Sequence, residues 1–207
     1  MWNPISRGIS AVNSSMKKFL LLLFVLPLLL PVVAQPGRAA RLSQAALELT
    51  RQQVVYDPAY YRIAYPNGDV PAGRGVCTDV VIRAYRRLGV DLQVEVYRDR
   101  LAAFHLYPRY AGQTQPDRNI DHRRVPNLMV FFSRNGTVLP NSTRASDYRP
   151  GDIVCWNLGG AVTHIGLVVD KKSAEGERPL IVHNIGAGQV LEDCLFRYRV
   201  IGHYRYQ

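Results

Sequence analysis

Four short runs rich in β-branched and aromatic residues occupy the last third of the chain and constrain its fold more than any other feature. Glycine, proline or charged residues separate the runs, which cover residues 152–157, 164–170, 180–183 and 197–204. This composition and this spacing are typical of β-strands. Because the connections are short, neighbouring strands are expected to pair antiparallel. The last third of the chain therefore predicts a small antiparallel sheet.

The part of the chain before these runs has the pattern of helices. Apolar residues recur at helical spacing in three segments, residues 39–55, 77–89 and 91–107. A loop rich in proline and glycine, residues 60–76, leads to Cys77 at the start of the second segment. Helices followed by strands predict an α+β fold, in which the N-terminal helices pack on one face of the small antiparallel sheet.

The N-terminal residues have the layout of a secretory signal. Two lysines precede an apolar run over residues 19–34, which ends at Ala34. Two prolines interrupt the run, and it is shorter than the ~20 residues that a membrane-spanning helix needs. We therefore predict a cleaved signal peptide over residues 1–34 and a single domain over residues 35–207, exported to the periplasm or cell envelope. A retained membrane span is the alternative.

Charge and cysteine content limit the partners and the kind of scaffold. Lys and Arg number 26 against 16 Asp and Glu, a net charge of +10, which favours anionic partners without naming them. Three cysteines with no CxxC pair are too few for a disulfide scaffold or a zinc ribbon. In an exported protein the simplest arrangement pairs Cys155 with Cys194 and leaves Cys77 free; three unpaired thiols are the alternative.

The candidate chemistry centres on Cys77 and two downstream histidines. A thiol in the first turn of a helix lies near unpaired backbone N–H groups and the positive end of the helix dipole, which favour the thiolate. His164 begins one predicted strand and His183 ends another. If these strands pair, His164 is expected to face the thiol as general base, with His183 orienting its ring. The alternative is that all three are ordinary core residues.

Sequence segments around these residues resemble known bacterial families. GVCTDVVIRAYRRLG, YRPGDIVCWN, THIGLVVD and IVHN, in that order, resemble the core of the NlpC-type cell-wall cysteine peptidases of the papain-like superfamily. Over a longer stretch, GDVPAGRGVCTDVVIRAYR, NIDHRRVPNL, RPGDIV, THIGLVVD and IGHYRY resemble the bacterial family called domain of unknown function 1287. The first resemblance implies a papain-like (NlpC-type) core.

The NlpC-type resemblance also implies roles for individual residues. It makes Cys77 the nucleophile, His164 the general base and His183 the polar residue that orients the base. It makes Asp152 part of a structural turn. A tyrosine upstream of the cysteine often lines the oxyanion region in that family, and Tyr61 and Tyr65 are the candidates.

The residues that flank the cysteine depart from the NlpC-type pattern. Those enzymes usually have Asp immediately before the cysteine and Ser-Gly after it. Here Val76 precedes Cys77, and Thr78 and Asp79 follow it. The resemblance therefore leaves the choice of substrate open.

A second polar cluster lies in the loop between two apolar stretches and comprises Asp121, His122, Arg123 and Arg124. Loops frequently carry binding groups. Guanidinium groups bind carboxylates in bidentate geometry, so Arg123 and Arg124 are predicted to clamp a substrate carboxylate. A solvated charge run or a structural Asp–Arg pair is the alternative.

Together these features predict an exported cysteine hydrolase that cleaves an amide in peptidoglycan stem peptides or a related envelope polymer through an acyl-enzyme. The alternatives are a catalytically silent wall-binding module, an acyltransferase on the same scaffold, and a zinc site formed by Cys77, His164 and His183. No motif implies a cofactor or a metal. We expect an anionic envelope polymer as partner, no nucleic acid, and membrane contact only through an uncleaved leader.

Overall fold

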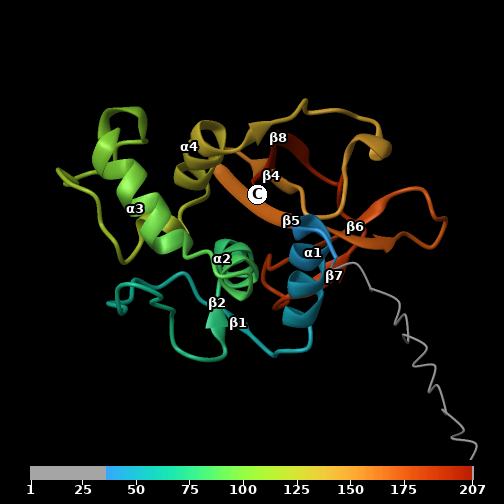
Figure 1. The fold of residues 1–207 in the computed structure, drawn as a ribbon, viewed down its shortest axis with the longest axis horizontal. Helices are drawn as coiled ribbons and strands as arrows, with labels where there is room; N and C mark the ends of the chain where they lie inside the picture. The colour runs from blue at the N-terminus through green and yellow to red at the C-terminus, as the bar shows by residue number, and fades with distance from the viewer. Residues whose placement is uncertain (1–35, 207) are drawn as a thin grey trace, which may run out of the picture. The chain divides into compact units, whose positions relative to one another are not determined.

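The structure, a computed structural model, describes residues 36–206. The predicted leader, residues 1–34, lies outside the described residues. Within residues 36–206, no helix combines the length and the apolar character that crossing a membrane would require. The described chain is a mixed α+β structure whose strands follow its helices, as the sequence pattern predicts (Figure 1).

The larger of the two sheets among the described residues has six strands in the order β3-β8-β4-β5-β6-β7. Its neighbouring strands pair antiparallel throughout. The bounds are β3 Thr137–Val138, β4 Ile153–Gly159, β5 Val162–Lys172, β6 Pro179–His183, β7 Val190–Glu192 and β8 Arg199–Arg205. The four predicted runs correspond to β4, β5, β6 and β8. The short strands β3 and β7 extend the sheet at its two edges and were not predicted.

Residues 36–206 contain four α-helices, three 3₁₀ turns and a small parallel pair of strands. The helices are α1 Arg38–Leu49, α2 Cys77–Arg87, α3 Leu92–Ala102 and α4 Val125–Asn135. The remaining elements are β1 Val55–Tyr56, β2 Arg74–Gly75, η1 Phe104–Leu106, η2 Asp121–Arg123 and η3 Ala145–Asp147. Helix α3 is shorter than the predicted helix over residues 91–107, because the chain turns at Ala103 and continues as η1.

Strand alternation divides the core between the two faces of the sheet. Helices α1 and α2 pack along β5, and α4 packs against β5 and β8 (Figure 1). The helix side of the sheet contributes Ile153, Cys155, Ile165, Leu167 and Val182 to one cluster with residues of α1, α2 and α4. The opposite side contributes Val154, Trp156, Val168 and Ile181 to a second cluster with Tyr148, Cys194 and Leu195. Residues adjacent along a strand therefore lie in different environments.

Two polar features fix the central strands in place. Asp152, immediately before β4, is fully buried and lies within 2.9 Å of the His203 ring and 2.7 Å of Arg205 Nε, both on β8. This structural role is the one that the resemblance implied for Asp152. In β5, a Cβ on Gly166 would lie 2.7 Å from Ile181 Cγ2 and 3.1 Å from His183 Cβ. The absence of a side chain at this position lets His183 pack closely across β5.

Candidate functional site

Cys77 is the first residue of α2, as predicted, and the residues after it anchor the start of that helix. The Asp79 carboxylate accepts a hydrogen bond from the Val76 N–H at 2.7 Å. Thr78 donates its hydroxyl to the Arg123 carbonyl at 3.1 Å. Asp79 also binds the Arg123 guanidinium through two contacts of 3.0 Å. Thr78 and Asp79, which depart from the NlpC-type pattern, therefore dock the η2 segment against α2.

The Cys77 thiol is buried, and burial determines its protonation state. Desolvation, with a smaller contribution from the Asp79 carboxylate, raises the pKa of the thiol to about 12. The backbone N–H groups of Ile165, Thr78 and Cys77 itself act in the opposite direction but are outweighed. The predicted thiolate is therefore not the resting form. The helix terminus stabilises an anion, but the loss of water around a buried sulfur costs more.

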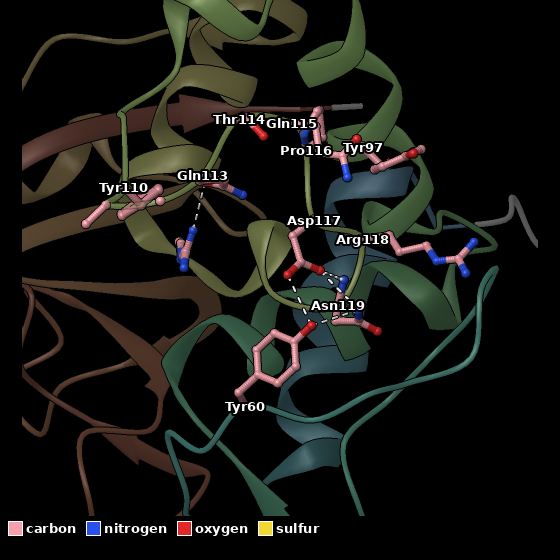
Figure 2. Close-up of a pocket in the computed structure, with 13 residues that line it drawn as sticks. Tyr60, Tyr97, Tyr110, Gln113, Thr114, Gln115, Pro116, Asp117, Arg118 and Asn119 are labelled. Atoms are coloured by element: carbon pink, nitrogen blue, oxygen red, sulfur yellow. Dashed lines mark hydrogen bonds between the residues drawn. The ribbon is translucent and has the colours of Figure 1, made fainter.

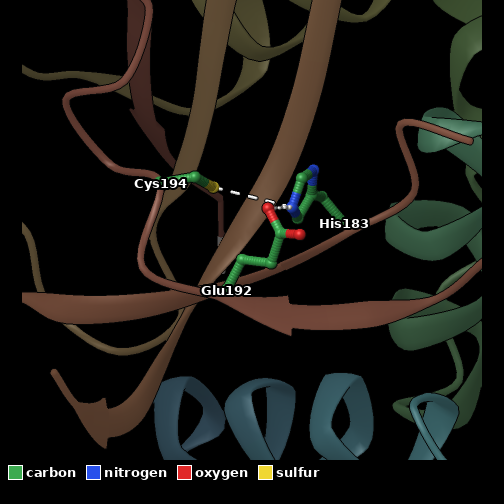
Figure 3. Close-up of side chains that lie close together, drawn as sticks. All are labelled: His183, Glu192 and Cys194. Atoms are coloured by element: carbon green, nitrogen blue, oxygen red, sulfur yellow. Dashed lines mark hydrogen bonds and ion pairs between the residues drawn. The ribbon is translucent and has the colours of Figure 1, made fainter. Parts of the chain in front are cut away.

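His164 and His183 lie side by side on paired strands. Strands β5 and β6 pair antiparallel, and His164 Nε2 lies 2.7 Å from His183 Nδ1. His183 continues the chain of contacts, because its Nε2 lies 3.3 Å from Glu192 Oε2 and 3.6 Å from Cys194 Sγ (Figure 3). The His164 ring also packs against Trp156, with 5.7 Å between the ring centroids. The two imidazoles thus belong to a buried polar row on the side of the sheet opposite the helices.

The expected contact between the Cys77 thiol and the His164 ring is not formed. Among the described residues, no hydrogen bond joins the Cys77 sulfur to either imidazole, and the His164 ring makes one only to His183. The physical reason is strand alternation: Ile165 points into the helix-side core with Cys77, so His164 points to the other side. The sulfur nevertheless lies beside this segment, because the Ile165 N–H lowers its pKa. The catalytic roles of these three residues stay predictions.

Both imidazoles are neutral over the ordinary pH range. Burial, with a smaller contribution from the neighbouring His183, lowers the pKa of His164 to about 3. Burial also lowers the pKa of His183, although the Glu192 carboxylate opposes that effect. A neutral imidazole keeps one ring nitrogen able to accept a proton, which is the form that a general base requires.

All three cysteines are free thiols, so the predicted Cys155–Cys194 disulfide is wrong and the alternative of three unpaired thiols is confirmed. Cys155 lies in the helix-side cluster and Cys194 in the cluster on the other side. The sheet separates the two sulfurs, and a disulfide cannot form across a strand backbone without moving it.

The polar cluster over residues 121–124 is mostly structural, which corrects the predicted substrate clamp. Arg123 is buried and uses its guanidinium on Asp79 and on the carbonyls of Ala59 and Asp57. Asp121 is buried and pairs with the buried Arg100. His122 is buried too, and burial lowers its pKa to about 3. The carboxylate of Asp121 and the guanidinium of Arg123 are thus engaged in buried ion pairs, which favours the alternative of structural Asp–Arg pairs over a clamp.

Arg123 and Arg124 both line the cleft in front of Cys77, but only the Arg124 side chain is partly exposed there. This cleft has a volume of about 270 Å³, and Tyr56, Tyr110 and Thr163 contribute to its walls. The Arg124 guanidinium stacks on the Tyr110 ring at 3.7 Å from its centroid. Tyr56 is close enough for the Cys77 thiol to raise its pKa, although burial is the larger cause.

A second, more polar cavity of about 560 Å³ shares Tyr110 and Arg124 with the cleft at Cys77. Tyr60 faces into it and is held by Asp117 at 3.1 Å and by Asn119 at 3.0 Å (Figure 2). The two adjoining cavities, together called the groove, are lined by polar and aromatic side chains, and Cys77 lies in the wall of the smaller one. Tyr65, one of the two predicted cleft tyrosines, packs instead against Tyr97 and Arg118.

Sequence comparison identifies the family of this chain. The sequence model of the family described as "Domain of unknown function (DUF1287)" matches residues 43–206. The chain belongs to this family. It is also 50% identical over 171 residues to "Uncharacterized protein YijF" of Escherichia coli (strain K12), an alignment that covers 81% of this chain and 83% of that protein. The predicted membership in the DUF1287 family is therefore confirmed.

Sequence reasoning missed three residues of the site in this DUF1287 protein. Tyr56 lines the Cys77 cleft, whereas the predicted Tyr61 binds Asp57 at 2.7 Å. Glu192 lies behind His183, and Arg100 holds Asp121 in the core. Position along the chain gave no signal for Glu192, because β7 is only three residues long. For Tyr56, the signal was its place in a short strand that pairs with the segment just before Cys77.

Proposed function

We propose that this DUF1287 protein is an exported cysteine hydrolase with a papain-like, NlpC-type core, which cleaves an amide bond through a Cys77 acyl-enzyme. The observation that carries the proposal is the row of contacts from His164 through His183 to Glu192, which begins at the residue next to Ile165, whose backbone N–H hydrogen-bonds to the Cys77 sulfur. A hydrogen-bonded row of this kind is the usual means of fixing the tautomer of a catalytic histidine.

The row selects one arrangement of protons. If the His183 Nε2–H donates to Glu192 Oε2, then His183 Nδ1 carries no proton. It therefore accepts a hydrogen bond from the His164 Nε2–H. The lone pair of His164 then lies on Nδ1, which makes no hydrogen bond within the described residues. This atom is the base that the reaction needs, and His183 and Glu192 are the residues that orient it.

The resting thiol is neutral, so proton transfer accompanies attack. Because burial raises the pKa of Cys77 to about 12, the thiol must give its proton to His164 Nδ1 as the sulfur attacks the carbonyl carbon. The proton then passes to the leaving amine, and water hydrolyses the thioester with the same base. In the unliganded protein the His164 ring and the Cys77 sulfur make no hydrogen bond, so the proposal requires the start of β5 to move and turn the ring toward the sulfur when substrate binds.

The groove accounts for substrate binding in this proposal. The Cys77 N–H at the start of α2 supplies one donor to the oxyanion, and the Tyr56 hydroxyl lies on the same cleft. Arg124 is the charged side chain placed to meet a substrate carboxylate. The net charge of +10 and the NlpC-type resemblance favour an anionic envelope polymer with peptide amides, of which peptidoglycan stem peptides are the best match.

Replacement of the nucleophile tests the proposal. We expect Cys77→Ala to abolish release of new amino groups from purified cell-wall fragments while the near-ultraviolet circular dichroism stays native. Cys155→Ala is the matched control, because Cys155 is also a buried free thiol on the helix side and lies outside the cleft. Full turnover by Cys77→Ala would contradict the mechanism.

A catalytically silent binding module is the second candidate, because the Cys77 sulfur is buried and makes no hydrogen bond to an imidazole among residues 36–206. In that case the groove at Tyr60, Tyr110 and Arg124 would bind the polymer without cleaving it. Treatment with a mild thiol electrophile near neutral pH separates the two. Labelling of Cys77 supports the enzyme, whereas retained binding to sacculi without labelling supports the module.

A further inference from the structure

His183, Glu192 and Cys194 place three metal-ligating atoms together outside the groove. His183 Nε2, the Glu192 carboxylate and Cys194 Sγ all lie within 4.8 Å of one another (Figure 3). The three side chains are those of a zinc-type donor set, with one nitrogen, one oxygen and one sulfur ligand. No other group of this kind occurs among residues 36–206.

The distances fit a tetrahedral ion as well as they fit hydrogen bonds. With Zn–N and Zn–O bonds of about 2.0 Å and a Zn–S bond of about 2.3 Å, neighbouring ligand atoms of a tetrahedron lie about 3.3 Å and about 3.6 Å apart. The observed separations are 3.3 Å between His183 Nε2 and Glu192 Oε2 and 3.6 Å between His183 Nε2 and Cys194 Sγ. Two of the three ligand pairs therefore already have the spacing of a tetrahedral site, and all three ligand atoms lie within 4.8 Å of one another.

The backbone holds the three ligands in place. His183 is the last residue of β6, Glu192 is the last residue of β7, and Cys194 follows two residues later. Strands β6 and β7 pair antiparallel, with His183 opposite Val190 and Ile181 opposite Glu192. Two ligands on one hairpin and a third at its exit form a preorganised site.

The surroundings provide the outer contacts that metal ligands usually have. His183 Nδ1 is 2.7 Å from His164 Nε2, and Arg197 binds Glu192 Oε2 at 2.9 Å. Such contacts orient ligands and tune their basicity. His183 and Cys194 are buried, whereas the Glu192 side chain is 30% exposed, so one side of the cluster is open to water.

We propose that His183, Glu192 and Cys194 bind a divalent cation of the zinc class, with a water molecule as the fourth ligand. Binding replaces the Cys194 thiol proton, which leaves to solvent, and forms the metal–thiolate bond. The cation occupies His183 Nε2, so the ring proton lies on Nδ1 and is donated to His164 Nε2.

This consequence bears on the proposed function and rests on it. When His183 donates to His164 Nε2, the His164 proton lies on Nδ1, and that atom no longer accepts the Cys77 proton. The metal-bound form is therefore the inactive form of the proposed hydrolase. The cation is an inhibitor that acts through the His183–His164 hydrogen bond, without entering the cleft at Cys77.

Metal titration of the purified full-length protein tests the site without reference to activity. We expect one equivalent of Zn²⁺ to bind in calorimetry, and Co²⁺ to give the thiolate-to-metal charge-transfer absorption of a bound sulfur ligand. Cys194→Ala should abolish that absorption and weaken Zn²⁺ binding by roughly 100-fold. Cys155→Ala is the matched control and should bind as the wild type does.

Two further measurements complete the test. Glu192→Gln, at a partly exposed position, should also weaken Zn²⁺ binding, which covers the case in which Cys194→Ala fails to fold. Cys77→Ala should bind Zn²⁺ normally, because it removes the proposed nucleophile and leaves the site intact. Nitrogen-15 spectra of the histidine rings should show His183 Nδ1 becoming protonated when Zn²⁺ binds.

Different results would contradict the metal site, its link to His164 and the proposed function. Absence of stoichiometric Zn²⁺ binding, or unchanged binding by Cys194→Ala, overturns the metal site whatever the activity. An unprotonated His183 Nδ1 in the Zn²⁺-bound protein overturns the link to His164. Inactivity of the metal-free wild type on cell-wall fragments counts against the proposed function alone.

Discussion

The two faces of the sheet carry side chains of different character, although these side chains belong to adjacent residues of one strand. Ile165 faces the helices and is surrounded by apolar side chains of the larger core cluster. His164, one residue earlier, faces the other way and hydrogen-bonds to His183, with Glu192 behind it. The helix side is a packed core with a buried thiol, whereas the opposite side carries a row of polar groups that ends at a partly exposed carboxylate.

The difference shows where stability and chemistry are separated in this fold. Apolar packing against α1, α2 and α4 stabilises the sheet, and it also explains why the Cys77 thiol is neutral. The polar row adds little apolar burial, but it fixes the proton positions on two imidazoles. Truncation of an apolar residue such as Ile165 should therefore lower the free energy of unfolding, and changes within the polar row should mainly alter reactivity.

The largest effect is expected from the polar side. His164→Ala removes the proposed base, so turnover on cell-wall fragments should fall by roughly 10²–10⁴-fold, the usual contribution of general acid–base catalysis. Steady-state hydrolysis is the measurement, with circular dichroism as the check on folding. His105→Ala is the matched control, because His105 is an exposed residue of η1. Equal losses in the two variants would contradict the assignment.

The neighbouring residue should give the opposite result. Ile165→Ala removes a fully buried side chain from the helix-side core, so the free energy of unfolding should fall by about 2–5 kcal/mol. Urea denaturation followed by tryptophan fluorescence measures this loss. Val162→Ala, at an exposed position of the same strand, is the control and should change stability by less than about 0.5 kcal/mol. A similar midpoint for both variants would contradict the division between the faces.

The same two faces show what the sequence could predict. Period-2 alternation and helical spacing located β4, β5, β6, β8 and the start of α2, because these depend on local patterns. Local patterns do not say which groups meet in space. Arg123 resembled a surface clamp because its partner Asp79 is 44 residues away, and the Cys155–Cys194 pairing failed because the two sulfurs lie on opposite faces.

The balance between burial and local fields was the other property that sequence could not give. A helix N-terminus favours a thiolate, but the structure shows that desolvation of Cys77 dominates. Glu192 was missed because β7 is too short to have a pattern, and only strand pairing brings it to His183.

Asp152, the buried carboxylate immediately before β4, is a polar group that we expect to contribute to the free energy of unfolding. Burial alone would raise the pKa of Asp152, but hydrogen bonds from His203, Arg205 and the Arg149 N–H outweigh it, so the pKa is lowered. A lowered folded-state pKa stabilises the protein above the unfolded value of about 3.9, and this stabilisation is lost as the pH falls through the folded value.

Asp152→Asn should therefore lower the free energy of unfolding by about 2 kcal/mol at about pH 7, the range for hydrogen bonds to charged groups. Below the unfolded-state value of about 3.9 the difference between wild type and variant should begin to shrink, and it should be lost as the pH falls through the lowered folded-state pKa of Asp152. Urea denaturation at several pH values measures it. A difference that stays constant with pH would show that packing, not charge, accounts for the role of Asp152.

The smallest effect is expected at the outer end of the polar row, where stability and reactivity separate most cleanly. Glu192→Gln keeps the size of the side chain but gives it an amide that can donate as well as accept, so His183 is no longer held in one tautomer. Turnover measured with a chelator present should fall roughly tenfold, which corresponds to about 1.4 kcal/mol, the scale of one hydrogen bond. The urea midpoint should hardly change, because Glu192 is partly exposed.

Glu175→Gln, at an exposed acid that also pairs with an arginine, should leave turnover unchanged. If Glu192→Gln turned over substrate at the wild-type rate, Glu192 would have no part in orienting His164, and His183 alone would have that role.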